Sequence, residues 1–295
     1  LHKSASRYAV IEAGISECDE MSELSAMIQP DLCLITNIGE AHLEGLGNLQ
    51  VVAEEKSKIM EFSKEGAQLV TAESVLHYKV FDAYKEGVTC VCPLSEKDRV
   101  SDEASYFYDY EYLSTGTSKV HVRHLNRSVE FEIQSLSPGM IQNAVLALAT
   151  AGTLGLELES VAKRLESWKP EMNRGSILNQ GGVLFYNDCY NANPSSMELA
   201  VHNFSQLHGN KILILGDMFE LGKEEISEHQ KIIDLCEKLD FKNVSLVGTR
   251  FGKCKHNYRH YPKTEMVKLL EMNTSSSFIL VKGSRGMKLE SLFSS

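Results

Sequence analysis

Residues 186–197 read Tyr-Asn-Asp-Cys-Tyr-Asn-Ala-Asn-Pro-Ser-Ser-Met, a polar stretch between two strongly patterned elements. The apolar run at 183–186 predicts a strand, and apolar residues spaced i, i+3, i+4, i+7 from Met197 predict a helix that begins near Pro194. Open α/β sheets bind ligands at the carboxyl ends of such strands. Asn, Asp, Pro and Ser are also ordinary turn residues. This turn is therefore either a capped connection or a binding loop, and the rest of the sequence favours the second.

Composition and charge restrict the classes of protein to consider. With 295 residues, 43% hydrophobic and 24% charged, the chain can form two globular domains. A net charge of −10 argues against nonspecific binding to nucleic acid, and no apolar run reaches the length of a membrane span. Seven scattered cysteines without a Cys-x-x-Cys pair fit a reduced cytoplasmic protein, which we expect to be a monomer. The chain begins with Leu1, which suggests a fragment.

Hydrophobic patterns alternate between strand and helix along the first part of the chain. We predict strands at 8–11, 32–36, 68–71 and 88–91, and helices at 21–28, 51–62, 140–154 and 158–168. Aromatic and β-branched residues dominate 105–133, and the alternation at 120–133 predicts a hairpin. The expected fold is a parallel sheet with crossover helices and a small antiparallel extension.

A second α/β unit follows Gly175. We predict strands at 183–186, 212–215, 244–247 and 278–281, and helices at 197–208, 224–239 and 264–272. This alternation is Rossmann-like. The two predicted domains are therefore 1–177 and 178–295.

Three side chains of the first domain are candidates for a site, although each has an ordinary explanation. Glu12 directly follows a predicted buried strand, so it either serves a metal or nucleotide or faces solvent. His42 follows the next predicted strand and, taken alone, is better explained as a surface or capping residue. Because both residues follow strands of one sheet, they could face one ion. Lys56 lies in an acidic helix, which favours a solvated i, i+4 ion pair.

Other candidates lie near the domain junction and in the second sheet. Arg174 can reach a phosphate with its fork of donors or form an interdomain salt bridge. Lys282 and Arg285 would meet an anionic group at the start of a last helix. His229 is interpreted as structural. The chain contains no Gly-x-x-x-x-Gly-Lys-Ser/Thr loop, so the phosphates of any bound ATP must be held elsewhere.

Taken together, the segments resemble the Mur ligases, the ATP-dependent amide-forming enzymes of peptidoglycan precursor synthesis. The resemblance is strongest to the branch that adds D-alanyl-D-alanine, and the matching segments are distributed along nearly the whole chain: 9–14, 41–47, 186–197, 215–222 and 281–285. It implies a partial central ATPase domain followed by a C-terminal ligase domain. The family's N-terminal UDP-binding domain and its phosphate loop would lie before Leu1, so this fragment alone is expected to be inactive.

The resemblance assigns roles in the first domain by position. Glu12 and His42 match Mg²⁺ ligands, and Lys56 matches a lysine that CO₂ converts to a carbamate, which would also bind the metal. This implication replaces the solvated ion pair as our expectation for Lys56. Asn143 would contact adenine. The sequence departs from the family at Gly139, which stands where the family usually has a histidine.

Near the end of the first domain, Arg174 would contact the nucleotide phosphates and, with Lys56 and His42, act in catalysis. Asp188 would bind the ribose, and three neighbours in the turn would lie near the nucleotide and the acceptor: Tyr190, Asn191 and Asn193.

The implied reaction joins D-Ala-D-Ala to UDP-MurNAc-tripeptide. ATP and Mg²⁺ would form an acyl phosphate that the dipeptide amine attacks. The alternatives are another Mur-type ligase, a relative of folylpolyglutamate synthetase, or a non-catalytic binding module without a phosphate loop. The Asn-Ala-Asn-Pro turn at 191–194 argues against the first two.

Overall fold

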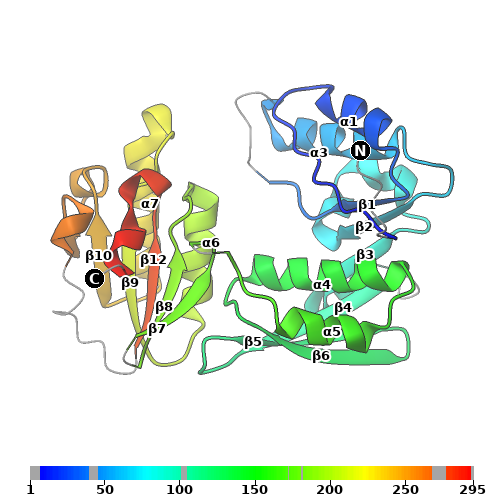
Figure 1. The fold of residues 1–295 in the computed structure, drawn as a ribbon. Helices are drawn as coiled ribbons and strands as arrows, with labels where there is room; N and C mark the ends of the chain where they lie inside the picture. Colours follow the sequence, from blue (N-terminus) through cyan, green and yellow to red (C-terminus); the bar gives the residue numbers. More distant parts are fainter. Residues whose placement is uncertain are drawn as a thin grey trace. The chain divides into compact units, whose positions relative to one another are not determined.

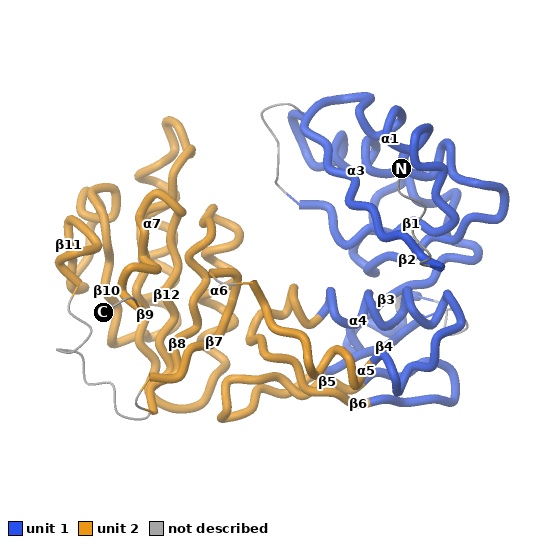
Figure 2. The backbone as a smooth tube through the Cα atoms, viewed as in Figure 1, with its two compact units in different colours: residues 1–109, 122–129, 142–161 blue, residues 110–121, 130–141, 162–295 orange. Residues whose placement is uncertain are grey.

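The computed structural model describes residues 7–39, 46–100, 105–171, 173–180, 182–267 and 277–293. Two compact units are present (Figure 2). Unit 1 comprises residues 1–109, 122–129 and 142–161, and unit 2 comprises residues 110–121, 130–141 and 162–295. The border between the units runs through several long elements around residues 105–166. The predicted division at 177/178 stays a prediction, although the second sheet does begin nearby, at Ser176.

The first sheet has six strands in sequential order (Figure 1). Its strands are β1 (Leu32–Ile35), β2 (Gln68–Ala72), β3 (Thr89–Pro93), β4 (Ser105–Tyr112), β5 (Ser118–His124) and β6 (Arg127–Ile133). Strands β1 to β4 pair in parallel. Two residues, Leu125 and Asn126, connect β5 to β6, and so short a connection joins antiparallel strands. The predicted parallel sheet with a hairpin extension is confirmed.

The helices of this part are α1 (Glu20–Ile28), α3 (Leu49–Ser57), α4 (Pro138–Thr153) and α5 (Leu158–Glu166). The side chain of Asn48 begins α3 by accepting the N–H of Val51 at 3.1 Å. The α-helix ends earlier than the predicted 51–62, because a 3-10 turn, Lys58–Met60, replaces its last part. A buried cluster around Cys33, Ala53 and Phe81 packs β1, α3 and the connections between strands together.

The strand predicted at 8–11 is wrong. Residues 8–11 have no strand hydrogen bonding, and Val10 is fully exposed. β1 is the edge strand of the first sheet in the part of the chain that the structure describes, and residues 8–11 do not pair with its free side. Strand propensity describes a half-buried pleated surface and does not supply the neighbour. Glu12 consequently does not follow a buried strand; it lies exposed in a segment without regular secondary structure.

The second sheet lies wholly in unit 2, and its order is β11-β10-β9-β12-β8-β7 (Figure 1). Its strands are β7 (Ser176–Gln180), β8 (Val183–Asp188), β9 (Asn210–Gly216), β10 (Asn243–Val247), β11 (Arg259–Tyr261) and β12 (Ser277–Lys282). All neighbours are parallel except β7, which pairs antiparallel with β8. The four predicted strands are confirmed. The edge strands β7 and β11 were not predicted.

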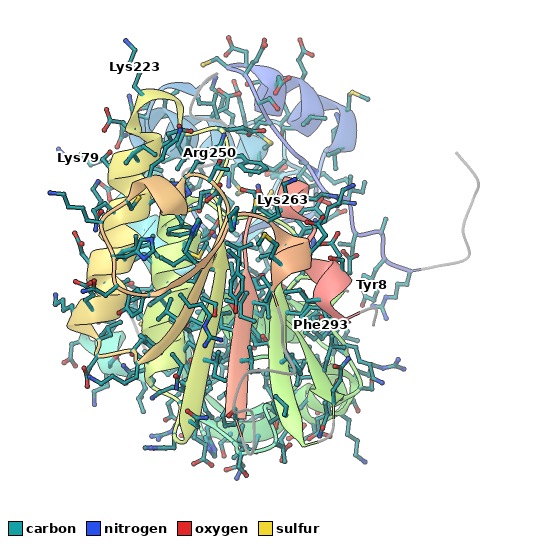
Figure 3. All side chains as sticks on the ribbon, turned by 90° about the vertical axis from the view of Figure 1, so that its left-hand side faces the viewer. Tyr8, Lys79, Lys223, Arg250, Lys263 and Phe293 are labelled. Carbon is teal, nitrogen blue, oxygen red and sulfur yellow. The ribbon has the colours of Figure 1, made fainter. Side chains whose placement is uncertain are left out.

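Apolar side chains alternate along these strands and build a core on each face of the second sheet. On one face, Leu213 and Leu215 pack with α6 (Pro194–Ser205) and α7 (Glu225–Lys238). On the other face, Ile212 and Ile214 pack with residues from the 3-10 turns after β12. The ring of Phe293, which is labelled in Figure 3, meets Phe185 edge to face there. A rigid strand framework therefore supports the loops at its carboxyl edge.

Two predicted helices of unit 2 are replaced by 3-10 turns where the structure describes them. The helix predicted at 264–272 begins in the structure as a 3-10 turn, Thr264–Met266. Residues 268–272 of that prediction lie outside the described residues. The last helix is also reduced to two 3-10 turns, Arg285–Met287 and Leu289–Phe293. A three-residue turn has no helix dipole of useful size, so the expected anion site at the start of a last helix is not formed.

Among the described residues, no helix is both long and apolar enough to cross a membrane. All seven cysteines are free thiols, as the sequence predicted.

Candidate functional site

The polar turn leaves the carboxyl end of β8 in the middle of unit 2. Asp188 is the last residue of β8, and the parallel register places it opposite Lys282, the last residue of β12. The chain reaches β9 from β8 by passing over the position that β12 later fills. The two residues therefore meet at a point where the strand order reverses, which is where open α/β sheets bind ligands.

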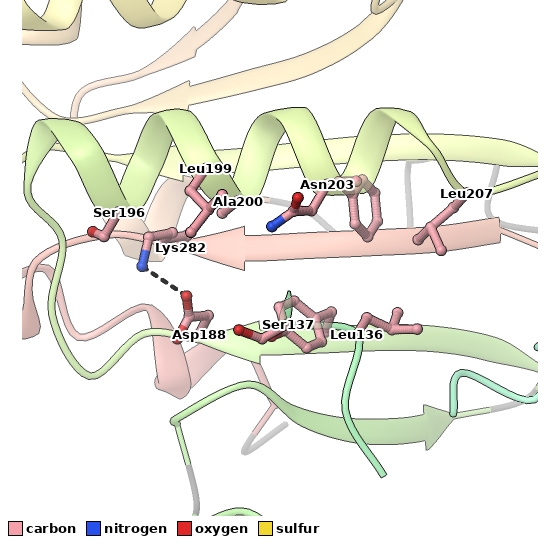
Figure 4. A pocket seen from close by; sticks show the side chains of 11 residues that line it. Leu136, Ser137, Asp188, Ser196, Leu199, Ala200, Asn203, Leu207 and Lys282 are labelled. Atoms are coloured by element: carbon pink, nitrogen blue, oxygen red, sulfur yellow. Dashed lines mark hydrogen bonds and ion pairs between the residues drawn. The ribbon is translucent and has the colours of Figure 1, made fainter. Parts of the chain in front are cut away.

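Lys282 fixes the geometry of this turn. Its side chain is only 3% exposed, and its Nζ donates to Asp188 Oδ2 at 2.6 Å and to the carbonyl of Asn191 at 3.2 Å (Figure 4). A buried ammonium needs such partners, because desolvation of an unpaired charge is costly. One cation therefore connects both ends of the segment that contains Tyr190. The sequence had placed Lys282 at a strand end but had not paired it with Asp188.

A pocket of about 120 Å³ opens beside this ion pair (Figure 4). Asp188, Lys282 and Ser196 contribute polar atoms to its lining, while Leu199 and Phe204 of α6 contribute apolar surface. All of its lining residues belong to unit 2. Small-molecule sites usually have this composition, with a few polar groups in a largely apolar pocket.

The residues before β7 are fastened to the same turn. The N–H of Tyr190 donates to the carbonyl of Asn173 at 2.9 Å, and the N–H of Gly175 donates to the carbonyl of Asn187 at 2.9 Å. The side-chain amide of Asn187 also donates to Asn173 Oδ1 at 2.8 Å. Gly175 has φ 73°, and a Cβ there would lie 2.6 Å from the hydroxyl of Tyr186. These contacts hold Arg174 beside the turn.

The predicted residues of the turn have different local roles. Asn193 caps α6: its Oδ1 accepts the N–H of Ser196 at 2.8 Å, and Ser196 Oγ accepts the N–H of Asn193 at 3.1 Å. Asn191 contributes its carbonyl to Lys282, and its Oδ1 accepts the N–H of Ala192. The capped-turn interpretation is therefore correct for Asn193. The side chains of Asp188 and Tyr190 are also accessible to a ligand, at 27% and 40% exposed, and Asn191 and Asn193 are exposed as well.

Lys56 is the predicted site residue of unit 1 with an unusual environment. Its Nζ donates to the carbonyl of Asn37, just after β1, at 3.1 Å, and burial lowers the pKa of Lys56 below its usual value. The acidic partners in this region belong to Lys58 instead, which contacts Asp19 and the buried Glu55, each at 2.7 Å. The solvated i, i+4 ion pair that the helix pattern favoured for Lys56 is therefore not formed, and the i, i+3 pair of Lys58 uses a buried carboxylate instead.

The other predicted residues of unit 1 do not form a metal site among the described residues. Glu12 is exposed, His42 lies outside the described residues, and no group of three His, Cys, Asp or Glu side chains converges in the part of the chain that the structure describes. Asn143 faces outward from α4. The Mg²⁺ ligand set stays a prediction.

A polar cluster that no sequence pattern indicated surrounds Asp217, which follows β9. Asp217 is 1% exposed, and its two carboxylate oxygens accept the N–H groups of Arg250 and Phe251, each at 3.0 Å. Gly248 has φ 119° and lets the backbone approach so closely that a Cβ would lie 2.3 Å from the carboxylate. Arg250, labelled in Figure 3, also binds Glu225 at 2.7 Å. The cluster joins the loops after β9 and β10.

His229 completes this cluster as a neutral ring. Its Nε2 accepts the N–H of Met218 at 2.9 Å, and its Nδ1 faces the carbonyl of Glu225, which fixes the proton on Nδ1. The 3.8 Å approach of Nε2 to Asp217 is therefore not an ion pair. Burial is the main cause that lowers the pKa of His229. The prediction that His229 is structural agrees with these contacts.

We expect His229 to make stability depend on pH. The unfolded chain takes up a proton on His229 near pH 6.5, whereas the folded chain does so only at lower pH. Between these values the unfolded state binds more protons, so the free energy of unfolding should fall as the pH decreases below about 6.5. His229→Gln keeps a donor and an acceptor but cannot titrate. Urea unfolding at pH 7.5, 6.5 and 5.5 should show a smaller pH slope in the variant, and equal slopes would contradict this role.

Comparison with known proteins relates this geometry to a family. The Mur ligase middle domain matches residues 1–151, and the Mur ligase, glutamate ligase domain matches residues 173–285. The UDP-N-acetylmuramoyl-tripeptide--D-alanyl-D-alanine ligase of Bacillus subtilis (strain 168) is 31% identical over 304 residues, which cover 96% of this chain and 63% of that protein.

Solved structures agree on the fold. MurF from Acinetobacter baumannii has a TM-score of 0.77 at 24% identity and covers 95% of this chain and 62% of its own. MurF ligase from Thermotoga maritima, solved in complex with ADP, has a TM-score of 0.73 at 21% identity and covers 95% and 64%. The chain thus spans less than two thirds of the length of each of these relatives. Because the middle-domain match alone covers more than half of the residues, the chain belongs to the Mur ligase family.

Proposed function

We propose that the protein containing this chain joins D-Ala-D-Ala to UDP-MurNAc-tripeptide with the hydrolysis of ATP. The terminal carboxylate of the tripeptide takes the γ-phosphoryl group of ATP and releases ADP. The dipeptide amine then attacks the acyl carbon, an amide bond forms, and phosphate leaves. The observation that carries the proposal is the similarity over 96% of the chain to the Bacillus subtilis ligase named for this reaction. The polar turn at the carboxyl end of β8 supports it.

We assign the nucleotide side of the site to three predicted residues. Asp188 is held by Lys282 through Oδ2, so a ribose hydroxyl can donate to its other oxygen. Arg174 keeps half of its side chain exposed and can direct its fork of donors toward phosphate oxygens. Asn143, exposed on α4, is assigned to adenine because an amide can both donate to and accept from a base edge. Tyr190 and Asn191 are assigned to the neighbouring acceptor region.

We assign Lys56 to carbamate formation. Its neutral amine would attack CO₂, form the N–C bond and release a proton, and the lowered pKa enlarges the neutral fraction that can react. The product is an anion in place of a cation. With Glu12 and His42 it would hold Mg²⁺, which, when bound, neutralises charge on the transferring phosphoryl group.

The carbamate leads to a direct test on the full protein. With ¹³C-bicarbonate present, we expect a carbamate NMR signal that grows as the pH rises and is lost in Lys56→Ala. Turnover should fall roughly tenfold to a hundredfold in that variant, the range for losing a group that organises a metal site. Lys64→Ala is the matched control, because among the described residues the side chain of Lys64 pairs only with Asp31, at the surface. A signal that persists in Lys56→Ala would place the carbamate elsewhere.

The reaction itself is tested by phosphate release from ATP. In the full protein, release should require both UDP-MurNAc-tripeptide and D-Ala-D-Ala. Release that does not depend on the dipeptide would overturn the assignment. Binding of the substrates without any release would favour the alternative of a non-catalytic binding module.

A further inference from the structure

Two arginines lie against one exposed tyrosine ring in unit 2. The guanidinium carbon of Arg174 is 3.9 Å from the centroid of the Tyr190 ring, and that of Arg285 is 5.1 Å from it. Tyr190 is 40% exposed and Arg285 is exposed. The three residues come from separate segments: the stretch before β7, the turn after β8 and the loop after β12. We call them the Tyr190 cluster.

Backbone contacts hold each member of the Tyr190 cluster in place. The segment of Arg174 is tied to the turn by the hydrogen bonds of Asn173 and Gly175 described above. Arg285 follows the buried Ser284, whose N–H donates to the carbonyl of Asp217 at 3.1 Å and whose Oγ donates to the carbonyl of Ala192 at 3.3 Å. The Oγ of Ser284 also accepts the N–H of Phe219 at 2.9 Å. The meeting of the two guanidinium groups is therefore built into the fold.

The Tyr190 cluster has more positive than negative charge. Its only carboxylate contact among the described residues is Glu171, 3.6 Å from Arg174 Nε and 83% exposed, which is a weak surface pair. No carboxylate pairs with Arg285 in the described part of the chain. The nearby carboxylate of Asp188 is already engaged by Lys282. Two cations gathered on one ring, in a chain with a net charge of −10, form a local site for an anion.

We propose that Arg285 is a further substrate-binding residue, which holds an oxyanion together with Arg174 across the ring of Tyr190. The ring fixes the guanidinium planes by cation–π contact, so their donors can face a planar or tetrahedral group of oxygens. All three substrates of the proposed reaction carry such groups. We assign the oxyanion to one of the two that the residues of the turn are expected to meet: the terminal carboxylate of the dipeptide or the phosphates of the nucleotide. This inference rests on the proposed function only for the identity of these ligands.

The experiment compares Arg285→Met with Arg285→Lys in the full protein. Methionine keeps the apolar stem, and lysine keeps the charge but loses the planar fork. Calorimetry measures the Kd of ADP, and phosphate release measures KM for D-Ala-D-Ala and for its C-terminal amide. Because Arg285→Met loses hydrogen bonds to a charged group, it should weaken the binding of one of the two ligands by roughly tenfold to a hundredfold. Arg285→Lys should weaken it less.

The pattern of losses identifies the source of the oxyanion. If Arg285 holds the carboxylate, Arg285→Met raises KM for the dipeptide, abolishes the preference for the free acid over the amide, and leaves the Kd of ADP unchanged. If it holds a phosphate, the Kd of ADP rises and the dipeptide KM does not. Unchanged values for both ligands would overturn the proposal.

Arg259→Met is the matched control, because Arg259 is an exposed arginine on β11, at the other edge of the sheet. Arg259→Met removes the same charge and should change neither the Kd of ADP nor the KM for the dipeptide. If it changes either value as much as Arg285→Met does, the effect is due to net charge. The ADP measurement does not depend on the ligase reaction. If the wild-type protein binds ADP but its phosphate release does not depend on the dipeptide, the proposed function is contradicted. The effect of Arg285→Met on the Kd of ADP would still test the role of Arg285.

Discussion

Asp217→Ala is expected to lower the free energy of unfolding by about 3–5 kcal/mol, because it leaves one buried and one part-buried N–H group without an acceptor. These are the amides of Arg250 and Phe251, each 3.0 Å from the carboxylate. An unsatisfied buried donor costs about 1–3 kcal/mol, and the space left beside Gly248 adds to this. Urea unfolding followed by circular dichroism should show a lower midpoint.

Two further variants separate the contributions at this position. Asp217→Asn keeps one acceptor oxygen and presents an amide group to the second donor, so it should lie between wild type and Asp217→Ala. Asp234→Ala is the control, because Asp234 is exposed and only accepts from Gln230 at 2.8 Å; it should change stability by less than about 0.5 kcal/mol. A loss below about 1 kcal/mol in Asp217→Ala would show that water or relaxed backbone satisfies both amides.

Local sequence patterns predicted most of the elements because each pattern is repeated over several residues. The strand into Asp188 and the helix that starts at Pro194 lie where periodicity and capping chemistry placed them. The strand at 8–11 shows the limit of that approach: its apolar pattern is strand-like, but a strand also needs a neighbour, and Val10 is fully exposed. The edge strand β11, Arg259–Tyr261, is too short to show a period.

The candidate site could be predicted only in part, because its contacts join distant segments. Asp188 and Lys282 are 94 residues apart, and they meet only because β12 enters the sheet beside β8. Nothing near Lys282 in the sequence indicates that register. Asp217 likewise depends on amides 33 and 34 residues further along the chain. The missing signal was strand order, which is set by how whole helices cover the sheet.

Lys282→Met is expected to have the largest effect on nucleotide binding among the variants at the β8 edge. The change removes the ammonium that holds Asp188 Oδ2 at 2.6 Å and the carbonyl of Asn191 at 3.2 Å, and it keeps most of the apolar stem. Asp188 is then free to leave the orientation assigned to the ribose. We expect the affinity for ADP to fall roughly tenfold to a hundredfold, as for a lost charged hydrogen bond.

Stability should also fall, by about 1–3 kcal/mol. Removing one partner of a fully buried pair costs about 3–5 kcal/mol, but the Asp188 side chain is 27% exposed, so water replaces part of the lost interaction. A double-mutant cycle with Asp188→Asn measures the coupling directly. The two changes should be non-additive by about 1–3 kcal/mol, since the residues share one contact.

Lys211→Met distinguishes positioning from stability. Lys211 also donates to two groups, the carbonyls of Ser205 at 2.9 Å and Leu207 at 2.7 Å, but it lies near the amino end of β9 rather than at the site. Its loss should destabilise the fold without changing the Kd of ADP. If Lys282→Met and Lys211→Met weaken the binding of ADP equally, the effect comes from a general loss of stability in unit 2. A loss of ADP affinity confined to Lys282→Met would mean that the ion pair positions Asp188 for the nucleotide.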